Sequence, residues 1–308
     1  MLTRRQLLAA SAGTGALYGT GLNALAQGIP TAPGELILKP IPSTGELLPV
    51  IGLGTNKWVA DGNEETMIQL GSTLIKFTNS GGRVIDTAPS YRSSENILGK
   101  LISENDIRNA FFLATKVDQE DKIDGLMRME KSRENLGAEQ IDLMQVHNLR
   151  GAEEQLKNML IWKSTGRLRY IGLTTSRTEQ YAEMEQLMNK FTIDFIQVNY
   201  SVIAREAENR ILPLAQEKKI GVMVNLPFQR GRLFKAVADT PLPEWCAEFD
   251  CASWAQFFLK FVVSHPAVTC VIPGMTKPEH AVDNMQACYG RLPDATQRAR
   301  MAKIFRTA

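Results

Sequence analysis

The sequence predicts an α/β protein of the (βα)8 TIM barrel class, in which parallel strands form a closed core inside a ring of helices. Eight apolar strand candidates recur near residues 50–53, 84–88, 110–117, 141–147, 168–174, 194–200, 220–227 and 268–273. They are continuous runs of Val, Ile, Leu and Phe, as expected for strands buried on both faces. Amphipathic segments alternate with them, and eight such units favour a closed barrel over an open doubly wound sheet, which remains the alternative fold.

The N-terminal residues predict an export signal that precedes the barrel. Arg4 and Arg5 directly precede a Gln-Leu-Leu sequence, and a stretch of small and apolar residues follows them. Ala24 and Ala26 then give an A-x-A cleavage pattern, which would make Gln27 the first mature residue. This combination is typical of a twin-arginine signal peptide.

These features divide the chain into a signal peptide over residues 1–26, a short linker over 27–35 and one barrel domain over 36–308. Twin-arginine signals direct folded proteins across the membrane, so we expect a periplasmic protein whose export partner is the twin-arginine translocase. The apolar stretch is interrupted by Gly and is short for a bilayer, so no stable membrane insertion is expected after cleavage. A cytoplasmic protein with a signal-like N-terminus remains the alternative.

Charge and cysteine content limit the classes of partner. The formal net charge is +2, from 35 Lys and Arg against 33 Asp and Glu, with no basic run outside the signal. Nucleic acid and anionic membranes are therefore poor candidates, and a small molecule is the expected partner. The four cysteines lack the spacing of a zinc site, and no metal is expected. An oxidising compartment would permit a disulfide, with Cys246 and Cys251 as the nearest pair.

Other elements follow from local patterns. The segments 35–41 and 46–50 are separated by Pro-Ser-Thr-Gly, which suits a hairpin that plugs one end of the barrel. Segments 66–80, 125–137 and 153–166 have apolar residues at three and four spacing, as in helices that cover a sheet. The residues after position 292 predict a final amphipathic helix.

Ionisable residues close three successive strand candidates. Asp86, Lys116 and His147 end the runs VIDTA, FFLATK and LMQVH or lie within them, and Tyr91 follows Asp86 by a few residues. The carboxyl ends of barrel strands meet at one face, where active sites form. Burying these four groups would be costly unless they satisfied one another. A lone His at a strand end is ordinarily a core residue, but the other three groups favour an active site.

Linked motifs across the barrel resemble those of the aldo/keto reductases. They are IGLGT, DTAPSYRSSE, ATKV, DLMQVHN, RYIGLTT, IQVNY and IPGMTKPEHAVDN, and the resemblance runs from about residue 36 to the C-terminus. It implies an oxidoreductase that reduces aldehyde or ketone carbonyls to alcohols with NADP(H), or with NAD(H) as the alternative cofactor. By the same resemblance, Asp86, Tyr91, Lys116 and His147 correspond to the family's catalytic tetrad.

Physical chemistry gives these residues distinct roles. Hydride addition to a carbonyl leaves an alkoxide that needs a proton, and Tyr91 is the natural donor. We expect the ammonium of Lys116 to lower the pKa of that phenol, and Asp86 to hold Lys116 charged and in place. His147 could donate to the substrate oxygen or orient the carbonyl.

The resemblance also implies where the cofactor binds. Its nicotinamide end would contact Thr55, Asp86, Thr174, Thr175, Gln197, Asn225, Leu226 and Phe228, and its adenosine phosphate end Gly274, Thr276, Lys277, His280 and Asn284. Four positions depart from the family pattern, and one of them is Gly274, which stands where some members carry Lys. Thr175 stands where Asn is usual and lacks its amide. Asn225 stands where many members stack an aromatic ring, a role that Phe228 could take over. His280 stands where Arg often binds the ribose 2′-phosphate.

Sequence constrains the substrate less closely. Short connections after His147 and after the last strand predict an open, shallow pocket, suited to a broad range of aldehydes and ketones or to a bulky substrate. Trp58, Trp245 and Trp254 are candidate pocket walls, with core or surface packing as the alternative for each. The alternative function is a nicotinamide-nucleotide-binding barrel that senses redox state or binds a partner with little turnover.

Overall fold

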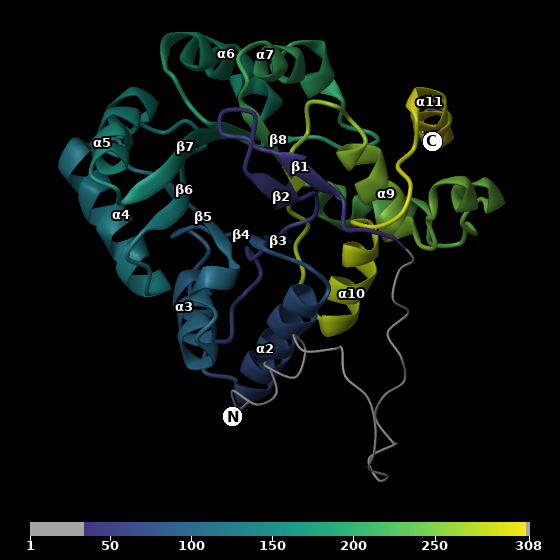
Figure 1. Cartoon of the computed structure of the whole chain (residues 1–308), viewed down its shortest axis with the longest axis horizontal. Helices are drawn as coiled ribbons and strands as arrows, with labels where there is room; N and C mark the ends of the chain where they lie inside the picture. The colour runs from purple at the N-terminus through teal and green to yellow at the C-terminus, as the bar shows by residue number, and fades with distance from the viewer. Residues whose placement is uncertain (1–33, 306–308) are drawn as a thin grey trace.

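The computed structural model describes residues 34–305 of the chain. The predicted signal peptide, including Arg4, Arg5 and the cleavage pattern before Gln27, lies outside the described residues (Figure 1). Within residues 34–305, no helix is both long enough and apolar enough to cross a bilayer.

Eight parallel strands follow one another around the sheet in chain order, which confirms the predicted barrel (Figure 1). They are β3 (Leu53–Gly54), β4 (Val84–Asp86), β5 (Phe112–Val117), β6 (Ile141–His147), β7 (Leu168–Thr174), β8 (Phe195–Asn199), β9 (Gly221–Asn225) and β10 (Cys270–Val271). Each overlaps one of the eight predicted apolar runs. Chain order without reversal means that every connection passes a helix over the outside of the sheet.

Backbone hydrogen bonds close the barrel between its first and last strands. The amide of Gly52 donates to the carbonyl of Val271 at 2.8 Å, and that of Gly54 donates to the carbonyl of Pro273 at 2.9 Å. A Cβ atom at Gly54 would lie 2.8 Å from the carbonyl oxygen of Ile272. Glycine therefore permits the close approach that joins the two ends of the sheet.

The predicted N-terminal hairpin is present and fills one end of the barrel. β1 (Leu38–Pro40) pairs antiparallel with β2 (Leu47–Pro49). Ile41 and Leu48, which flank the turn, are fully buried and belong to the same apolar cluster as inward-facing strand residues such as Phe112 and Phe195. The hairpin is thus a plug that excludes water from the end of the barrel opposite the predicted site.

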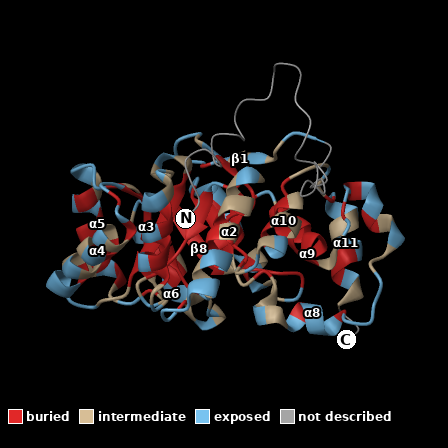
Figure 2. Cartoon of the chain, turned by 90° about the horizontal axis from the view of Figure 1, so that it is seen from below, coloured by how far each residue is buried: buried red, intermediate tan, exposed pale blue. Residues whose placement is uncertain are grey.

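Helices surround the sheet and bury their apolar faces against it, so that buried residues gather inside and exposed residues lie outside (Figure 2). They are α2 (Glu64–Asn79), α3 (Ser94–Asn105), α4 (Lys122–Leu136), α5 (Ala152–Ser164), α6 (Tyr181–Lys190), α7 (Ile211–Glu217), α8 (Arg232–Ala236), α9 (Trp254–Val263), α10 (Pro278–Gln286) and α11 (Ala295–Ile304). Short 3₁₀ turns occupy Arg108–Ala110, Thr178–Gln180, Glu206–Asn209, Gln229–Gly231 and Glu244–Phe249.

Local signals in the sequence set the bounds of these helices. In α2, the side chain of Asn63 accepts a hydrogen bond from the amide of Thr66, and the buried Leu70, Leu74 and Phe77 follow at helical spacing. The predicted final helix is α11, which begins with a reciprocal capping box formed by Asp294 and Gln297.

Alternation along the strands places polar groups at one end of the barrel interior. Residues at every second position face inward, because successive side chains of a strand point to opposite faces. The inward residues nearer the plug are apolar, whereas those at the carboxyl ends are polar. The apolar set includes Val84, Phe112, Ala114, Leu143, Tyr170, Phe195 and Met223, and the polar set includes Asp86, Lys116, Gln145, His147, Thr174, Gln197 and Asn225.

Candidate active site

A buried ion pair lies at the centre of the polar end of the barrel. Asp86 ends β4 and Lys116 lies on β5, with exposed fractions of 2% and 0%. The Nζ atom of Lys116 donates to Oδ2 of Asp86 and to the carbonyl of Thr87, each at 2.7 Å. Burial opposes the charge on Lys116, but Asp86 and Tyr91 outweigh that effect and raise its pKa. Lys116 is therefore an ammonium at neutral pH.

Tyr91, in the loop between β4 and α3, lies against this ammonium. Nζ of Lys116 is 4.9 Å from the centroid of the Tyr91 ring, and the ring of His147 meets that of Tyr91 edge-on, at 5.9 Å between centroids. Burial raises the pKa of the Tyr91 phenol, and the opposing effect of Lys116 is smaller. The expected net lowering of this pKa was wrong, because desolvation exceeds the attraction of the phenolate to Lys116. Tyr91 thus keeps its proton at neutral pH, as a general acid requires.

His147 ends β6 and is neutral at physiological pH. Burial, and next the positive charge of Lys116, lower the pKa of His147 to about 3. Its Nδ1 atom lies 3.3 Å from the hydroxyl oxygen of Ser90. When that hydroxyl donates to Nδ1, the ring proton resides on Nε2, which can then donate to a substrate oxygen. Ser90 was not among the residues expected from sequence.

Two glutamine amides complete the surroundings of Asp86. Oδ1 of Asp86 accepts from Nε2 of Gln197 at 2.8 Å and from Nε2 of Gln145 at 3.3 Å. Gln197 lies on β8 and reaches β4 across the barrel interior. Both oxygens of the Asp86 carboxylate therefore accept hydrogen bonds, Oδ2 from Lys116 and Oδ1 from the two glutamines. Sequence reasoning missed Gln145, although it lies two positions before His147 and therefore points to the same face of β6.

The residues expected at the nicotinamide end lie together around Gln197. The hydroxyl of Thr174 donates to Oε1 of Gln197 at 3.1 Å, and the amide of Asn225 donates to the same oxygen at 3.4 Å. Thr55 is fully buried and its hydroxyl donates to the carbonyl of Asp86 at 3.1 Å. The hydroxyl of Thr175 is already engaged, donating to the side chain of Gln180 at 2.5 Å.

One atom of this group suits an amide ligand. Oδ1 of Asn225 is buried and has no hydrogen-bond partner. An unpaired buried acceptor is costly, so its presence at the end of β9 favours a ligand that donates a hydrogen bond there. The carboxamide of a nicotinamide is such a donor, and the residues present therefore fit the nicotinamide end of the expected cofactor.

The residues expected at the adenosine phosphate end lie on the segment from β10 to the start of α10. Gly274, Lys277 and His280 are exposed, and α10 begins directly after Lys277. Asn284, on α10, is only 3% exposed, yet its side-chain amide makes no hydrogen bond within residues 34–305. A helix N-terminus beside a lysine fits a phosphate.

Neighbouring loops hold this segment in place. Nε2 of Gln69, on α2, donates to the carbonyl of Thr276 at 2.8 Å, and Nε1 of Trp58 donates to that of Met275 at 2.7 Å. Trp58 is fully buried, so it is a core residue that positions this segment rather than a pocket wall.

Other expected residues are engaged elsewhere. The ring of Phe228 packs against Phe234 and Phe258, with centroids 4.8 Å and 6.4 Å away, so the structure does not place it as a stacking partner for a nicotinamide. Leu226 lies in the loop after β9, half-buried and with a positive φ of 51°. Trp245 and Trp254 both pack against Phe257, which favours their alternative assignment to packing.

The cysteines and the potential metal ligands form no further site within residues 34–305. The four cysteines are buried and present as free thiols, so no disulfide joins Cys246 to Cys251 in this structure. Among residues 34–305, His, Cys, Asp and Glu nowhere gather in a group of three or more that could hold a metal ion.

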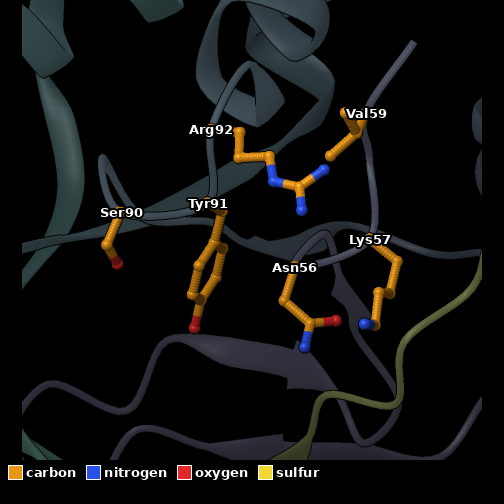
Figure 3. A pocket seen from close by; sticks show the side chains of 6 residues that line it. All are labelled: Asn56, Lys57, Val59, Ser90, Tyr91 and Arg92. Atoms are coloured by element: carbon orange, nitrogen blue, oxygen red, sulfur yellow. The ribbon is translucent and has the colours of Figure 1, made fainter. Parts of the chain in front are cut away.

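A cavity of about 390 Å³ opens beside Tyr91 (Figure 3). The loop after β3 lines one side of it and the loop after β4 lines the other. Its lining residues are Asn56, Lys57, Val59, Ser90, Tyr91 and Arg92. A carbonyl compound bound in this cavity would lie next to the phenol of Tyr91, and the cavity is therefore the candidate substrate site.

Comparisons with known sequences and structures found similar proteins. The sequence model described as "Aldo/keto reductase family" matches residues 50–304. Aldo-keto reductase YhdN of Bacillus subtilis is 33% identical over 63% of this chain and 62% of its own length, so the chain spans less than two thirds of that relative. The NADH-specific methylglyoxal reductase of Escherichia coli is 23% identical over 83% of this chain and 94% of its own.

A solved structure shares the fold. The aldo/keto reductase of Klebsiella pneumoniae, in complex with NADP and acetate, superposes with a TM-score of 0.73 and 25% identity. The superposition covers 85% of this chain and 93% of that protein.

Proposed function

Because the chain belongs to the aldo/keto reductase family, we propose that it is an NADP(H)-dependent oxidoreductase that reduces aldehyde or ketone carbonyls to alcohols, with Tyr91 as the general acid. The observation that carries the proposal is the position of Lys116. Its ammonium is fixed by Asp86 at 2.7 Å and lies against the ring of Tyr91. An ion pair that served stability alone would not need a phenol that lines a cavity and a neutral imidazole against that phenol.

The residues would divide the work as follows. A bound nicotinamide supplies the hydride. Tyr91 donates its proton to the substrate oxygen as negative charge develops there, and Lys116 stabilises the phenolate that remains. Neutral His147 donates to the same oxygen from Nε2 and so orients the carbonyl. Asp86, held by Gln145 and Gln197, keeps Lys116 charged and fixed.

Residues at the ends of β7, β8 and β9 would hold the nicotinamide. Gln197, Thr174 and the unpaired Oδ1 of Asn225 offer the polar atoms, while Lys277 and the start of α10 would bind the adenosine phosphate. NADP(H) is the preferred cofactor in this proposal, and NAD(H) is the alternative. The solved relative from Klebsiella binds NADP, whereas the Escherichia coli relative is named as NADH-specific.

The direct test has two parts. Fluorescence titration of the purified protein with NADPH and NADH measures binding, and consumption of NADPH with a panel of aldehydes and ketones measures turnover. Binding with turnover would support the reductase. Binding without turnover would favour the alternative of a nucleotide-holding protein, and the absence of binding would reject both.

Cofactor preference should respond to His280, which is exposed two residues into α10. We expect His280→Arg to tighten NADPH relative to NADH by about tenfold or more, because a guanidinium adds a charge-assisted hydrogen bond to the 2′-phosphate, worth roughly 1.5 to 3 kcal/mol. The measurement is the ratio of the two Kd values by fluorescence titration. An unchanged ratio would mean that residue 280 does not face the 2′-phosphate.

The N-terminal motif supports the further proposal that the protein is exported by the twin-arginine route and acts in the periplasm. We expect the double variant Arg4→Lys, Arg5→Lys to accumulate in the cytoplasm, because the translocase recognises the arginine pair. Cell fractionation of wild type and variant gives the answer. Retention of both proteins in the cytoplasm would support the cytoplasmic alternative.

A further inference from the structure

Two cations line the candidate substrate cavity without a carboxylate to neutralise them. The side chains of Arg92 and Lys57 approach the cavity from its two sides (Figure 3), and neither forms an ion pair or a hydrogen bond within residues 34–305. Arg150, in the loop after β6, is by contrast paired with Glu120 at 3.2 Å. The cavity lining contains no Asp or Glu.

The two loops that carry these cations are fixed to each other. The buried hydroxyl of Ser94, at the start of α3, donates to the carbonyl of Thr55 at 2.6 Å and to that of Trp58 at 3.1 Å. Those carbonyls flank Lys57, and Ser94 lies two residues after Arg92. The fold therefore holds the two loops that carry these exposed side chains on opposite sides of the cavity.

The backbone at Arg92 forms a fixed turn at the edge of the cavity. Arg92 has a φ of 53°, in the left-handed region that residues with a Cβ adopt at a cost. The turn is held by hydrogen bonds from the amide of Tyr91 to the carbonyl of Ala88 at 3.0 Å and from the amide of Ser94 to the carbonyl of Tyr91 at 3.1 Å. The turn thus fixes the backbone of Arg92 directly after the proposed acid, and the exposed guanidinium is among the groups that line the cavity (Figure 3).

From this arrangement we propose that Arg92, assisted by Lys57, is a specificity-determining residue that selects carbonyl substrates carrying a carboxylate group. The proposal rests on the reductase function proposed above and names its substrate class. Two cations that line one cavity with no carboxylate in its lining give it a positive potential, which attracts an anion. The planar guanidinium matches a carboxylate in two parallel hydrogen bonds, which fixes the carbonyl of the same molecule relative to Tyr91.

A pair of aldehydes that differ in charge tests the proposal. The probes are 4-carboxybenzaldehyde and its neutral methyl ester, each assayed for NADPH consumption by the purified protein. The quantity compared is the ratio of kcat/KM for the acid to that for the ester, so that differences in intrinsic reactivity and in folded fraction cancel between variants. We expect wild type to favour the acid, and added salt to reduce the ratio. Arg92→Gln should lower the ratio about tenfold or more, mainly through KM, whereas Arg92→Lys should retain part of it.

Lys219 provides a matched control. It is an exposed lysine with a φ of 56°, and it lies just before β9, at the opposite end of the barrel from the cavity. Lys219→Gln removes the same charge from the same backbone conformation and should leave the ratio unchanged.

Lys57 needs a separate readout, because its loop lies close to Gly274, a residue expected to contact the cofactor. A Cβ atom at Gly274 would lie 3.5 Å from Oδ1 of Asn56, the neighbour of Lys57. Lys57→Gln should lower the ratio less than Arg92→Gln does, without weakening NADPH in the titration. Weaker NADPH binding with an unchanged ratio would assign Lys57 to the cofactor and overturn its part in the proposal. Turnover of the ester with a ratio that Arg92→Gln leaves unchanged would overturn the proposal as a whole, while the reductase function stood. Failure to reduce any member of the aldehyde and ketone panel, these two probes included, despite NADPH binding would instead reject the proposed function.

Discussion

Replacing Tyr91 by Phe should lower the rate of carbonyl reduction by about 10²- to 10⁴-fold, the usual contribution of general acid catalysis. The change removes only the hydroxyl that carries the transferred proton. The ring of Phe keeps its place between Lys116 and His147, so the cavity keeps its shape. The measurement is kcat for NADPH consumption at saturating aldehyde, together with Kd for NADPH by fluorescence titration, which should change little.

Tyr289 offers a matched control for this variant. Its hydroxyl is partly buried and donates to the carbonyl of Ser80 at 3.1 Å. Ser80 comes four residues before β4 begins, whereas Asp86 of the tetrad ends that strand. Tyr289→Phe deletes the same atom and should leave kcat unchanged. If Tyr91→Phe turned over as fast as Tyr289→Phe, Tyr91 would not be the acid.

The fold could be predicted from sequence because each barrel strand is buried on both faces. Continuous apolar runs such as 110–117 and 141–147 therefore stand out from the amphipathic helices between them, and β5 and β6 lie within these runs. The hairpin plug could be predicted from the Pro-Ser-Thr-Gly turn between two apolar segments. The short strands β3 and β10 were less well defined, because closure there depends on the glycines at 52 and 54 and on contacts between the two ends of the chain.

The candidate site was predictable where a charged residue interrupts an apolar run, as at Asp86 and Lys116. Gln145 and Ser90 were missed because an uncharged polar residue gives no comparable signal until its partner is known. The shift in the pKa of Tyr91 was predicted in the wrong direction. The sequence indicates that Lys116 is near, but it does not show that burial of the phenol raises the pKa more than Lys116 lowers it. Arg92 lies in the motif DTAPSYRSSE, yet only the structure shows that it lines a cavity that contains no carboxylate.

Replacing Lys116 by Met should both destabilise the protein and abolish most of its activity. Removing one partner of a buried ion pair leaves the other charge uncompensated, which typically costs about 3 to 5 kcal/mol of unfolding free energy. Asp86 would keep its hydrogen bonds from Gln197 and Gln145 but lose the 2.7 Å bond from Nζ. Proton transfer would slow as well, because no cation would stabilise the phenolate of Tyr91. Urea unfolding and NADPH consumption measure the two effects.

A second substitution separates stability from catalysis. The double variant Lys116→Met, Asp86→Asn removes both charges and retains an acceptor for the glutamine amides, so it should recover much of the lost stability but little of the lost turnover. Lys260 supplies the converse control, since its buried Nζ donates to the carbonyls of Phe249, Tyr289 and Arg291, away from the tetrad. Lys260→Met should destabilise the fold while the folded enzyme keeps its kcat. If the double variant regained turnover in step with stability, Lys116 would serve the fold and not the proton transfer.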